Sequence, residues 1–176
     1  MLIASSSKRK IAGILLFVIL FAMLSSCAVQ GSGCRSPIEA VETLLQAMDK
    51  RNVNVLVSLL SPRTIEKFTH GNPSKIHSVL RAEFNKRADM DIVTIEAFST
   101  KVFNPPFTED RLVNYGVDAN TLGLDDNITE LVSVSYRVTV NDKEYKKDDI
   151  YTTVGSKLCG KIGEYWYILE AEFNVI

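Results

Sequence analysis

The amino-acid sequence predicts an α+β domain in which N-terminal helices pack on one side of an antiparallel sheet, preceded by a signal or anchor segment. Two observations predict this order. Apolar residues recur at helical spacing between residues 36 and 84, whereas residues 92–173 are rich in β-branched and aromatic residues that alternate with polar ones. Helices followed by a run of strands are typical of an α+β fold, and strands with one apolar face are typical of an antiparallel sheet.

The first element is the segment of residues 8–27. Basic residues at positions 8–10 precede an apolar run at 11–24, which ends in the tetrapeptide Leu24-Ser25-Ser26-Cys27. A basic start, an apolar core of about 7–15 residues and small residues at the exit are typical of a secretory signal peptide. The ending resembles the lipobox of bacterial lipoproteins. This resemblance implies that cleavage follows Ser26 and that Cys27 carries a diacylglyceryl group and further acyl chains such as palmitate.

An uncleaved membrane anchor is the main alternative for this segment, and a plain secreted protein is the third. As a helix, residues 11–24 would rise about 21 Å, which is short of a hydrocarbon core of about 30 Å. In both anchored forms the basic residues stay in the cytoplasm, so the domain faces away from it. In a bacterium with two membranes, Ala28 after the lipidated cysteine resembles lipoproteins that are sorted to the outer membrane.

These features divide the chain into a lipoprotein signal peptide at 1–26, a flexible tether at 27–35 and a single α+β domain at 36–176. The signal holds three of the 20 basic residues and none of the 21 acidic ones, which leaves the mature part with a net charge of −4. A nucleic-acid-binding surface needs clustered basic residues, so we expect no nucleic-acid partner.

The domain begins with the capping box Ser36-Pro37-Ile38-Glu39, and a helix with one apolar face extends to about Lys50. Shorter helical pieces are expected after Asn52 and from Ser61-Pro62 to Phe68. A third helix is expected after the turn at 70–73.

A long strand is expected at 92–103, ended by Pro105-Pro106. Residues 107–127 have no clean period and predict a long surface loop with one helical turn. The clearest strand is 130–140, with Val132, Val134, Tyr136, Val138 and Val140 on one face. Further strands are expected from about 145 to 158 and from 165 to about 173, joined by a turn at 160–164.

Three segments together resemble the nuclear-transport-factor-2-like superfamily, in particular small lipid-anchored bacterial members with a lumazine-binding-like or cystatin-like domain of unknown function. They are the opening helix at 36–50, the segment Arg51-Asn52-Val53-Asn54-Val55-Leu56 and the closing strand Gly163-Glu164-Tyr165-Trp166-Tyr167-Ile168. The resemblance covers about 36–173 and departs from the compact members between 105 and 127. It implies a strongly curved sheet that forms a cone around the first helix.

The remaining cysteines and histidines offer few sites. Cys34 and Cys159 are a candidate disulfide in an oxidising compartment, or else an idle tether thiol and a small strand residue. There is no CxxC pair and only two histidines, so we expect no metal site. No GxSxG, phosphate-binding glycine loop or HExxH motif is present, and we expect no cofactor.

Three residues are candidates for a pocket inside the sheet: Tyr136, Glu96 and Trp166. Tyr136 lies in the middle of the apolar face of its strand, Glu96 shares a side with Ile92 and Phe98, and Trp166 shares a side with Ile168. For Tyr136 and Trp166 the more ordinary interpretation is a core residue. Glu96 would ordinarily point to solvent.

Two functions follow from these observations. The first is a membrane-tethered, non-catalytic module that binds an envelope protein or a small-molecule ligand. The second is a small lyase- or isomerase-like enzyme that uses Tyr136 and Glu96 as acid and base inside the sheet. The anchor and the absence of a convergent catalytic set favour the first, and the second requires that both side chains point to the same face.

Overall fold

The computed structural model describes residues 33–85, 90–113, 122–142 and 149–170. The chain divides into two compact units, Met1–Gln30 and Gly31–Ile176. The first unit, which contains the predicted signal peptide and Cys27, lies outside the described residues, so the second is described by itself.

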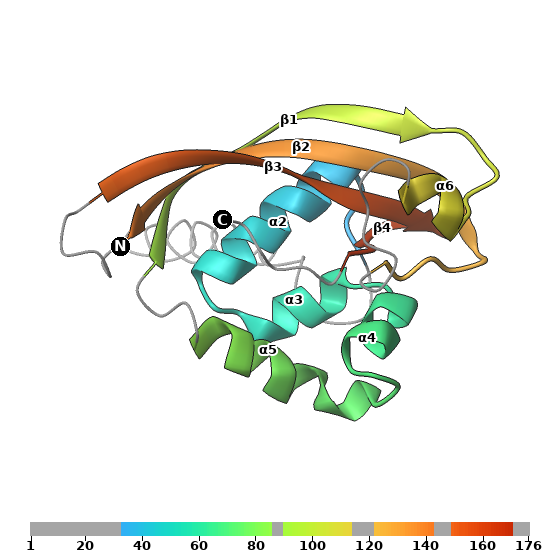
Figure 1. Cartoon of the computed structure of the whole chain (residues 1–176), viewed down its shortest axis with the longest axis horizontal. Helices are drawn as coiled ribbons and strands as arrows, with labels where there is room; N and C mark the ends of the chain where they lie inside the picture. The colour runs from blue at the N-terminus through green and yellow to red at the C-terminus, as the bar shows by residue number, and fades with distance from the viewer. Residues whose placement is uncertain (1–32, 86–89, 114–121, 143–148, 171–176) are drawn as a thin grey trace, which may run out of the picture. The chain divides into compact units, whose positions relative to one another are not determined.

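The sheet has four antiparallel strands in the order β1-β2-β3-β4 and is open. The strands are β1 (Met90–Phe103), β2 (Ile128–Asp142), β3 (Asp149–Ile162) and β4 (Tyr165–Ile168). The three long strands arch over helix α2 (Pro37–Asp49), as Figure 1 shows. Irregularities in the pairing of β1 with β2, between Ile92 and Thr94 and between Ala97 and Ser99, are bulges of the kind that bend a strand. The predicted α+β class is confirmed.

Helix α2 begins as the capping box predicts. Ser36 is the N-cap, and its side-chain oxygen accepts a hydrogen bond from the Glu39 backbone N–H at 3.1 Å. The Glu39 carboxylate accepts from the backbone N–H of Arg35 at 2.9 Å, one residue before the cap. Val41, Leu44 and Leu45 on the buried face of α2 are completely inaccessible to solvent, and this burial ties the helix to the inner face of the sheet.

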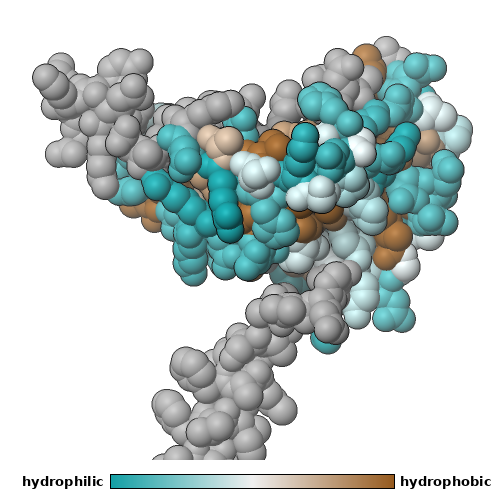
Figure 2. Space-filling view, turned by 90° about the horizontal axis from the view of Figure 1, so that it is seen from below, coloured by the Kyte–Doolittle hydropathy of each residue, from teal (hydrophilic) through white to brown (hydrophobic). Residues whose placement is uncertain are grey.

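Three further helices and a short 3-10 turn form a layer beyond α2: α3 (Val53–Leu59), α4 (Pro62–Phe68), η1 (Pro73–Lys75) and α5 (Ile76–Asn85). Asn52 caps α3 by accepting from the Val55 N–H, and Ser61 caps α4 by accepting from the Thr64 N–H. The side of the domain that carries α4 and α5 presents a mainly hydrophilic surface with hydrophobic side chains between the polar ones (Figure 2). The predicted helical pieces are confirmed, including the third helix.

The main core lies between the helices and the inner face of the sheet. The five residues predicted to share one face of β2 are all buried, at 5% exposed or less: Val132, Val134, Tyr136, Val138 and Val140. They pack with the buried faces of α2, α3 and α5 in one cluster. Full burial of a side chain of this kind contributes about 1.5–3 kcal/mol relative to exposure.

A second core lies on the other face of the sheet, at the end where β1 and β3 finish. It contains the buried residues Leu112, Leu122, Ile128, Leu131, Leu158 and Leu169. Leu112 belongs to the short helix α6 (Glu109–Val113), and Leu122 is completely inaccessible to solvent. The expected helical turn is confirmed as α6. The expected surface position is wrong for these two segments, because they bury Leu112 and Leu122. Residues 114–121 lie outside the described residues.

A buried hydrogen-bonded junction joins α4 to the end of β4. The Ser61 and Thr64 hydroxyls lie 2.7 Å apart, and the Thr64 hydroxyl donates to the Ile168 carbonyl at 3.2 Å. Gly123 donates its N–H to the Leu169 carbonyl at 2.7 Å. A β-carbon on Gly123 would lie 2.3 Å from the Thr64 nitrogen, so only glycine allows this approach.

Three expected boundaries differ from the structure. Strand β3 continues through Gly160 to Ile162, and the turn is made by residues 163 and 164, where Gly163 has a φ of 63°. Strand β4 ends at Ile168, and the expected extension at 171–173 lies outside the described residues. At the start of the domain, Cys34 already exchanges two backbone hydrogen bonds with Trp166, two residues before the expected start at residue 36.

Candidate functional site

Tyr136 points from the middle of β2 into the main core. It pairs with Ala97 of β1 and Gly155 of β3, and its side chain is 2% exposed. A β-carbon on Gly155 would lie 2.5 Å from the Tyr136 hydroxyl oxygen, so the missing side chain of Gly155 makes the room that the phenol occupies. Burial raises the pKa of Tyr136, and the charge of Glu170 raises it further. The phenol therefore stays neutral over the physiological range.

Lys157 and Glu170 are the ionisable pair beside this phenol. Lys157 pairs with Val134 in the sheet and therefore shares the inner face with Tyr136. Its side chain is 4% exposed and that of Glu170 is 17% exposed. The Lys157 Nζ lies 3.9 Å from Glu170 Oε2, a separation that is too long for a direct hydrogen bond but close enough for two charges to offset each other.

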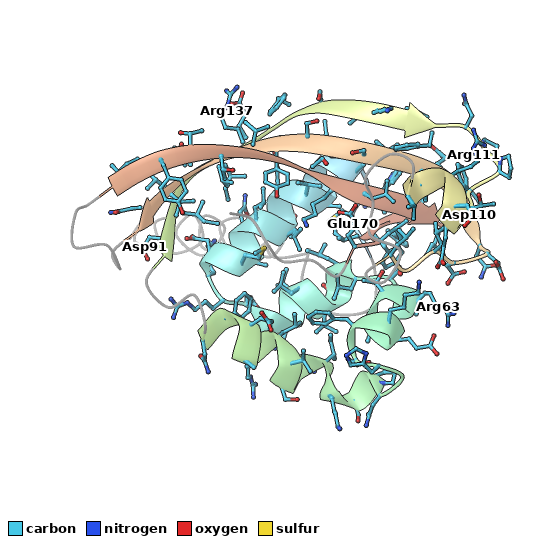
Figure 3. The ribbon with its side chains drawn as sticks, in the orientation of Figure 1. Arg63, Asp91, Asp110, Arg111, Arg137 and Glu170 are labelled. Carbon is cyan, nitrogen blue, oxygen red and sulfur yellow. The ribbon has the colours of Figure 1, made fainter. Side chains whose placement is uncertain are left out.

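Strand register places Glu170 opposite Lys157. Cys159 pairs with Ile168, and Leu169 donates its N–H to the Leu158 carbonyl, so the next residue on the inner face is Glu170. Figure 3 shows Glu170 beneath the sheet, on the side where the helices lie. A lysine and a glutamate thus meet in the interior, where an unpaired charge would be costly.

Cys159 is a further ionisable group on this face. It is completely buried, and burial raises the pKa of its thiol far above the ordinary range; Glu170 and Cys34 raise it further, while Lys157 lowers it. A thiol attacks as the thiolate, so Cys159 has none of the character of a nucleophile.

The candidate disulfide is not formed in the structure. Cys34 and Cys159 are both buried free thiols. The Cys34 thiol donates to the Thr43 hydroxyl at 3.8 Å, and the Cys159 thiol donates to the Pro37 carbonyl at 3.8 Å. The alternative of an idle tether thiol is also wrong for Cys34, because its backbone pairs with Trp166.

Glu96 lies on the opposite face from Tyr136. It pairs with Arg137 across β1 and β2, and its carboxylate accepts from Arg137 Nη1 at 3.1 Å. Its side chain is 60% exposed. Arg137 lies on the outer side of the sheet in Figure 3, with its guanidinium carbon 5.4 Å from the centre of the Phe98 ring. Tyr136 and Glu96 therefore cannot serve as the acid and base of one pocket.

Trp166 is a core residue, which is the more ordinary of the two interpretations of the sequence. It is 6% exposed and belongs to the main core with Ile168, while Tyr165 on the other side is 37% exposed. Its backbone N–H donates to the Cys34 carbonyl at 2.8 Å. The Trp166 backbone therefore holds the start of the domain against β4.

Lys157 and Glu170 are not among the residues that the sequence singles out. The signal for Lys157 was its spacing, because residues 157 and 159 of a strand share a face and Cys159 was a strand candidate. Glu170 gave no such signal, since it follows β4 and its position depends on pairing with distant residues.

Other groups offer little chemistry. Among the residues that the structure describes, no set of three or more His, Cys, Asp or Glu side chains is placed to hold a metal ion. Within the same part of the chain, no helix combines the length and the apolar character needed to cross a membrane. His70 and His77 are exposed and lie outside the sheet.

Comparisons with protein families, with curated proteins and with solved structures found no match to this chain.

Proposed function

We propose that this protein is a lipid-anchored lipoprotein of the bacterial cell envelope, whose α+β domain has a cone-shaped, nuclear-transport-factor-2-like fold and is a non-catalytic binding or interaction module. The observation that carries the proposal is the tetrapeptide Leu24-Ser25-Ser26-Cys27 directly after a basic triplet and an apolar run. A plain membrane anchor has no chemical need for small residues and a cysteine at its end.

The anchor would act through acyl chains rather than through a spanning helix. A diacylglyceryl group on Cys27, together with an acylated amine, supplies more than one chain, and two or more chains anchor a protein stably. The short segment Gly31-Ser32-Gly33 separates this anchor from Cys34, where backbone pairing with Trp166 begins. The domain would then work close to the membrane, on the side away from the cytoplasm, and Ala28 favours the outer membrane where a cell has two.

The inner face of the sheet supports a role without catalysis. Lys157 and Glu170 lie close enough to offset each other's charge. The raised pKa values of Tyr136 and Cys159 keep both groups protonated at neutral pH. An acid–base mechanism needs one group that accepts a proton and one that donates it near the working pH. Glu96, the expected partner of Tyr136, lies on the outer face.

The test is incorporation of labelled palmitate into the full chain in a bacterial host, compared with two cysteine variants. Wild type and Cys34→Ala should both incorporate the label and shorten to the mature form, whereas Cys27→Ala should do neither. Protease added to spheroplasts should digest the wild-type domain. Labelling of Cys27→Ala equal to that of wild type, or a domain protected from external protease, would overturn the proposal.

A further inference from the structure

A hollow opens on the surface where the end of α2, the start of α3 and the end of α5 meet. Its volume is about 540 Å³, and it is lined by Lys50, Arg51, Asn52, Val53, Asn54, Arg81, Phe84 and Asn85. Ligand sites in proteins commonly have volumes of about 300–1,000 Å³. The hollow is far enough open to solvent that a ligand could enter without rearrangement of the helices.

The lining is basic. It contains three cations, Lys50, Arg51 and Arg81, and among the described residues that line it none carries a carboxylate. Asp49, the neighbour of Lys50 in the chain, is not part of the lining, and its carboxylate accepts from the Ile92 backbone N–H at 3.1 Å. The lining residues are therefore complementary in charge to an anionic ligand.

Amide and aromatic groups complete the lining. Asn52, Asn54 and Asn85 supply side-chain amides that can donate hydrogen bonds to anionic oxygens. The Asn52 side-chain oxygen accepts from the Val55 N–H, which leaves the hydrogens of its amide nitrogen for another acceptor. Phe84 adds an apolar surface that suits the organic part of a ligand.

The backbone that carries these groups is held in place by the end of α2. Arg51 donates its N–H to the Met48 carbonyl at 3.1 Å, and Asn52 donates to the Ala47 carbonyl at 2.7 Å. Arg51 has a φ of 51°, a left-handed conformation that glycine adopts most easily at a helix end. The chain has an arginine there instead, on the lining of the basic hollow.

We propose that this hollow is a binding site for a phosphate-bearing ligand. The three cations would offset the charge of a phosphate group, and each arginine can bind two phosphate oxygens at once. The side-chain amides would donate further hydrogen bonds to the phosphate. This proposal rests on the proposed function in one respect, namely that the domain is a binding module. It adds the position of the site and the class of ligand. The phosphate could belong to a soluble metabolite or to a lipid headgroup, which present the same chemistry.

The test is calorimetric titration of the full chain, purified in a neutral detergent, with inorganic phosphate at constant ionic strength. Arg51→Gly and Arg81→Gln should each weaken binding about tenfold, since a charged hydrogen-bonding partner is lost. Arg63→Gln is the matched control, because Arg63 lies on α4, outside the hollow, and pairs with Glu66. Its affinity should equal that of wild type. Arg51→Gly relieves a left-handed backbone, so its loss of binding would not come from unfolding.

Two further titrants distinguish the sources of the phosphate, namely glycerol phosphate and dihexanoyl phosphatidic acid. A lipid that binds more than tenfold tighter than glycerol phosphate, with the same sensitivity to Arg51→Gly and Arg81→Gln, assigns the site to a headgroup. Equal affinities assign it to a soluble ligand. Absence of phosphate binding in wild type, or equal binding in all variants, would overturn the proposal. Because palmitate labelling of Cys27 is measured separately, a failure here would leave the anchor proposal standing.

Discussion

The ammonium nitrogen of Lys157 lies 3.9 Å from a carboxylate oxygen of Glu170, so a charge pair joins β3 to the chain that follows β4. Both groups face the main core, beside the Tyr136 phenol, whose pKa the charge of Glu170 helps to raise. The pair thus links the last described residues of the chain to the middle of the sheet. Each charge is tolerated there because the other is present.

Removal of one partner should destabilise the fold. Glu170→Leu leaves a buried ammonium and should lower the free energy of unfolding by about 3 kcal/mol, and Lys157→Met should have a similar cost. The double variant Lys157→Met, Glu170→Leu should be close to wild type, since two apolar side chains of similar size replace the pair. Urea unfolding of the four proteins measures the coupling. Additive losses in the double variant would show that the two charges do not stabilise each other.

Alkaline pH should weaken the fold through Tyr136 and Cys159. Their ordinary pKa values of 10.0 and 9.0 apply to the unfolded chain, and both are raised in the fold. For each group, at a pH between its ordinary pKa and its raised pKa in the fold, the unfolded chain has released a proton that the folded chain keeps. Their contribution to stability is therefore complete below pH 9.0 and is lost as the pH rises, by up to about 1.4 kcal/mol per pH unit for each group.

The measurement is the urea midpoint of wild type, Tyr136→Phe and Cys159→Ala between pH 7 and 11, with a reductant present. Each variant should lose a constant amount of stability from altered packing and should show a shallower decline above about pH 9. A decline parallel to that of wild type in both variants would mean that neither group keeps its proton in the fold.

Gly155 should be intolerant of a side chain while Tyr136 is present. A β-carbon there would lie 2.5 Å from the phenolic oxygen and 2.6 Å from the ring carbon that bears it. Gly155→Ala should therefore cost about 1–3 kcal/mol through overpacking. In a Tyr136→Leu background the same change should be neutral or stabilising, because alanine restricts the unfolded chain more than glycine does. Thermal unfolding of the four proteins decides between these outcomes, and an equal cost in both backgrounds would contradict the contact.

Arg51→Gly should stabilise the domain by about 1 kcal/mol, because glycine adopts the left-handed conformation of φ 51° without strain. Lys50→Gly is the matched control, since it removes the same charge from a residue with a φ of −80°. It should destabilise by about 0.5 kcal/mol. If both variants shift the melting temperature in the same direction, charge rather than backbone strain determines the stability of this corner.

Local signals in the sequence predicted most of the elements. The capping box from Ser36 to Glu39 located the start of α2, and the alternation from Val132 to Val140 identified the buried face of β2. Both patterns depend only on residues close together in the chain, which is why a single sequence reveals them. Alternation likewise placed Trp166 on the side of Ile168, and of its two interpretations, pocket or core residue, the structure shows the core residue.

The second core and the inner charge pair were not predictable in this way. Leu112 and Leu122 lie in short segments without a period, and each is buried only because distant strands bring Leu131 and Leu158 beneath it. For Glu96 the error has the opposite direction, because a candidate for the inside of the sheet is 60% exposed on the outer face. The irregularity between Ile92 and Thr94 changes the register of β1. Ile92 therefore pairs with Val140, whereas Glu96 pairs with Arg137, so the two residues do not share the side that simple alternation gives them.

The central claim, a domain tethered by lipid on Cys27, is tested most directly by the intact mass of the protein purified from bacterial membranes. The account predicts the mass of residues 27–176 plus a diacylglyceryl group and an amide-linked acyl chain, and no such species from Cys27→Ala. An unmodified mass of the full 176-residue chain in the wild-type protein would contradict it. Cys27 would then be an ordinary cysteine, and residues 11–24 would be an uncleaved anchor.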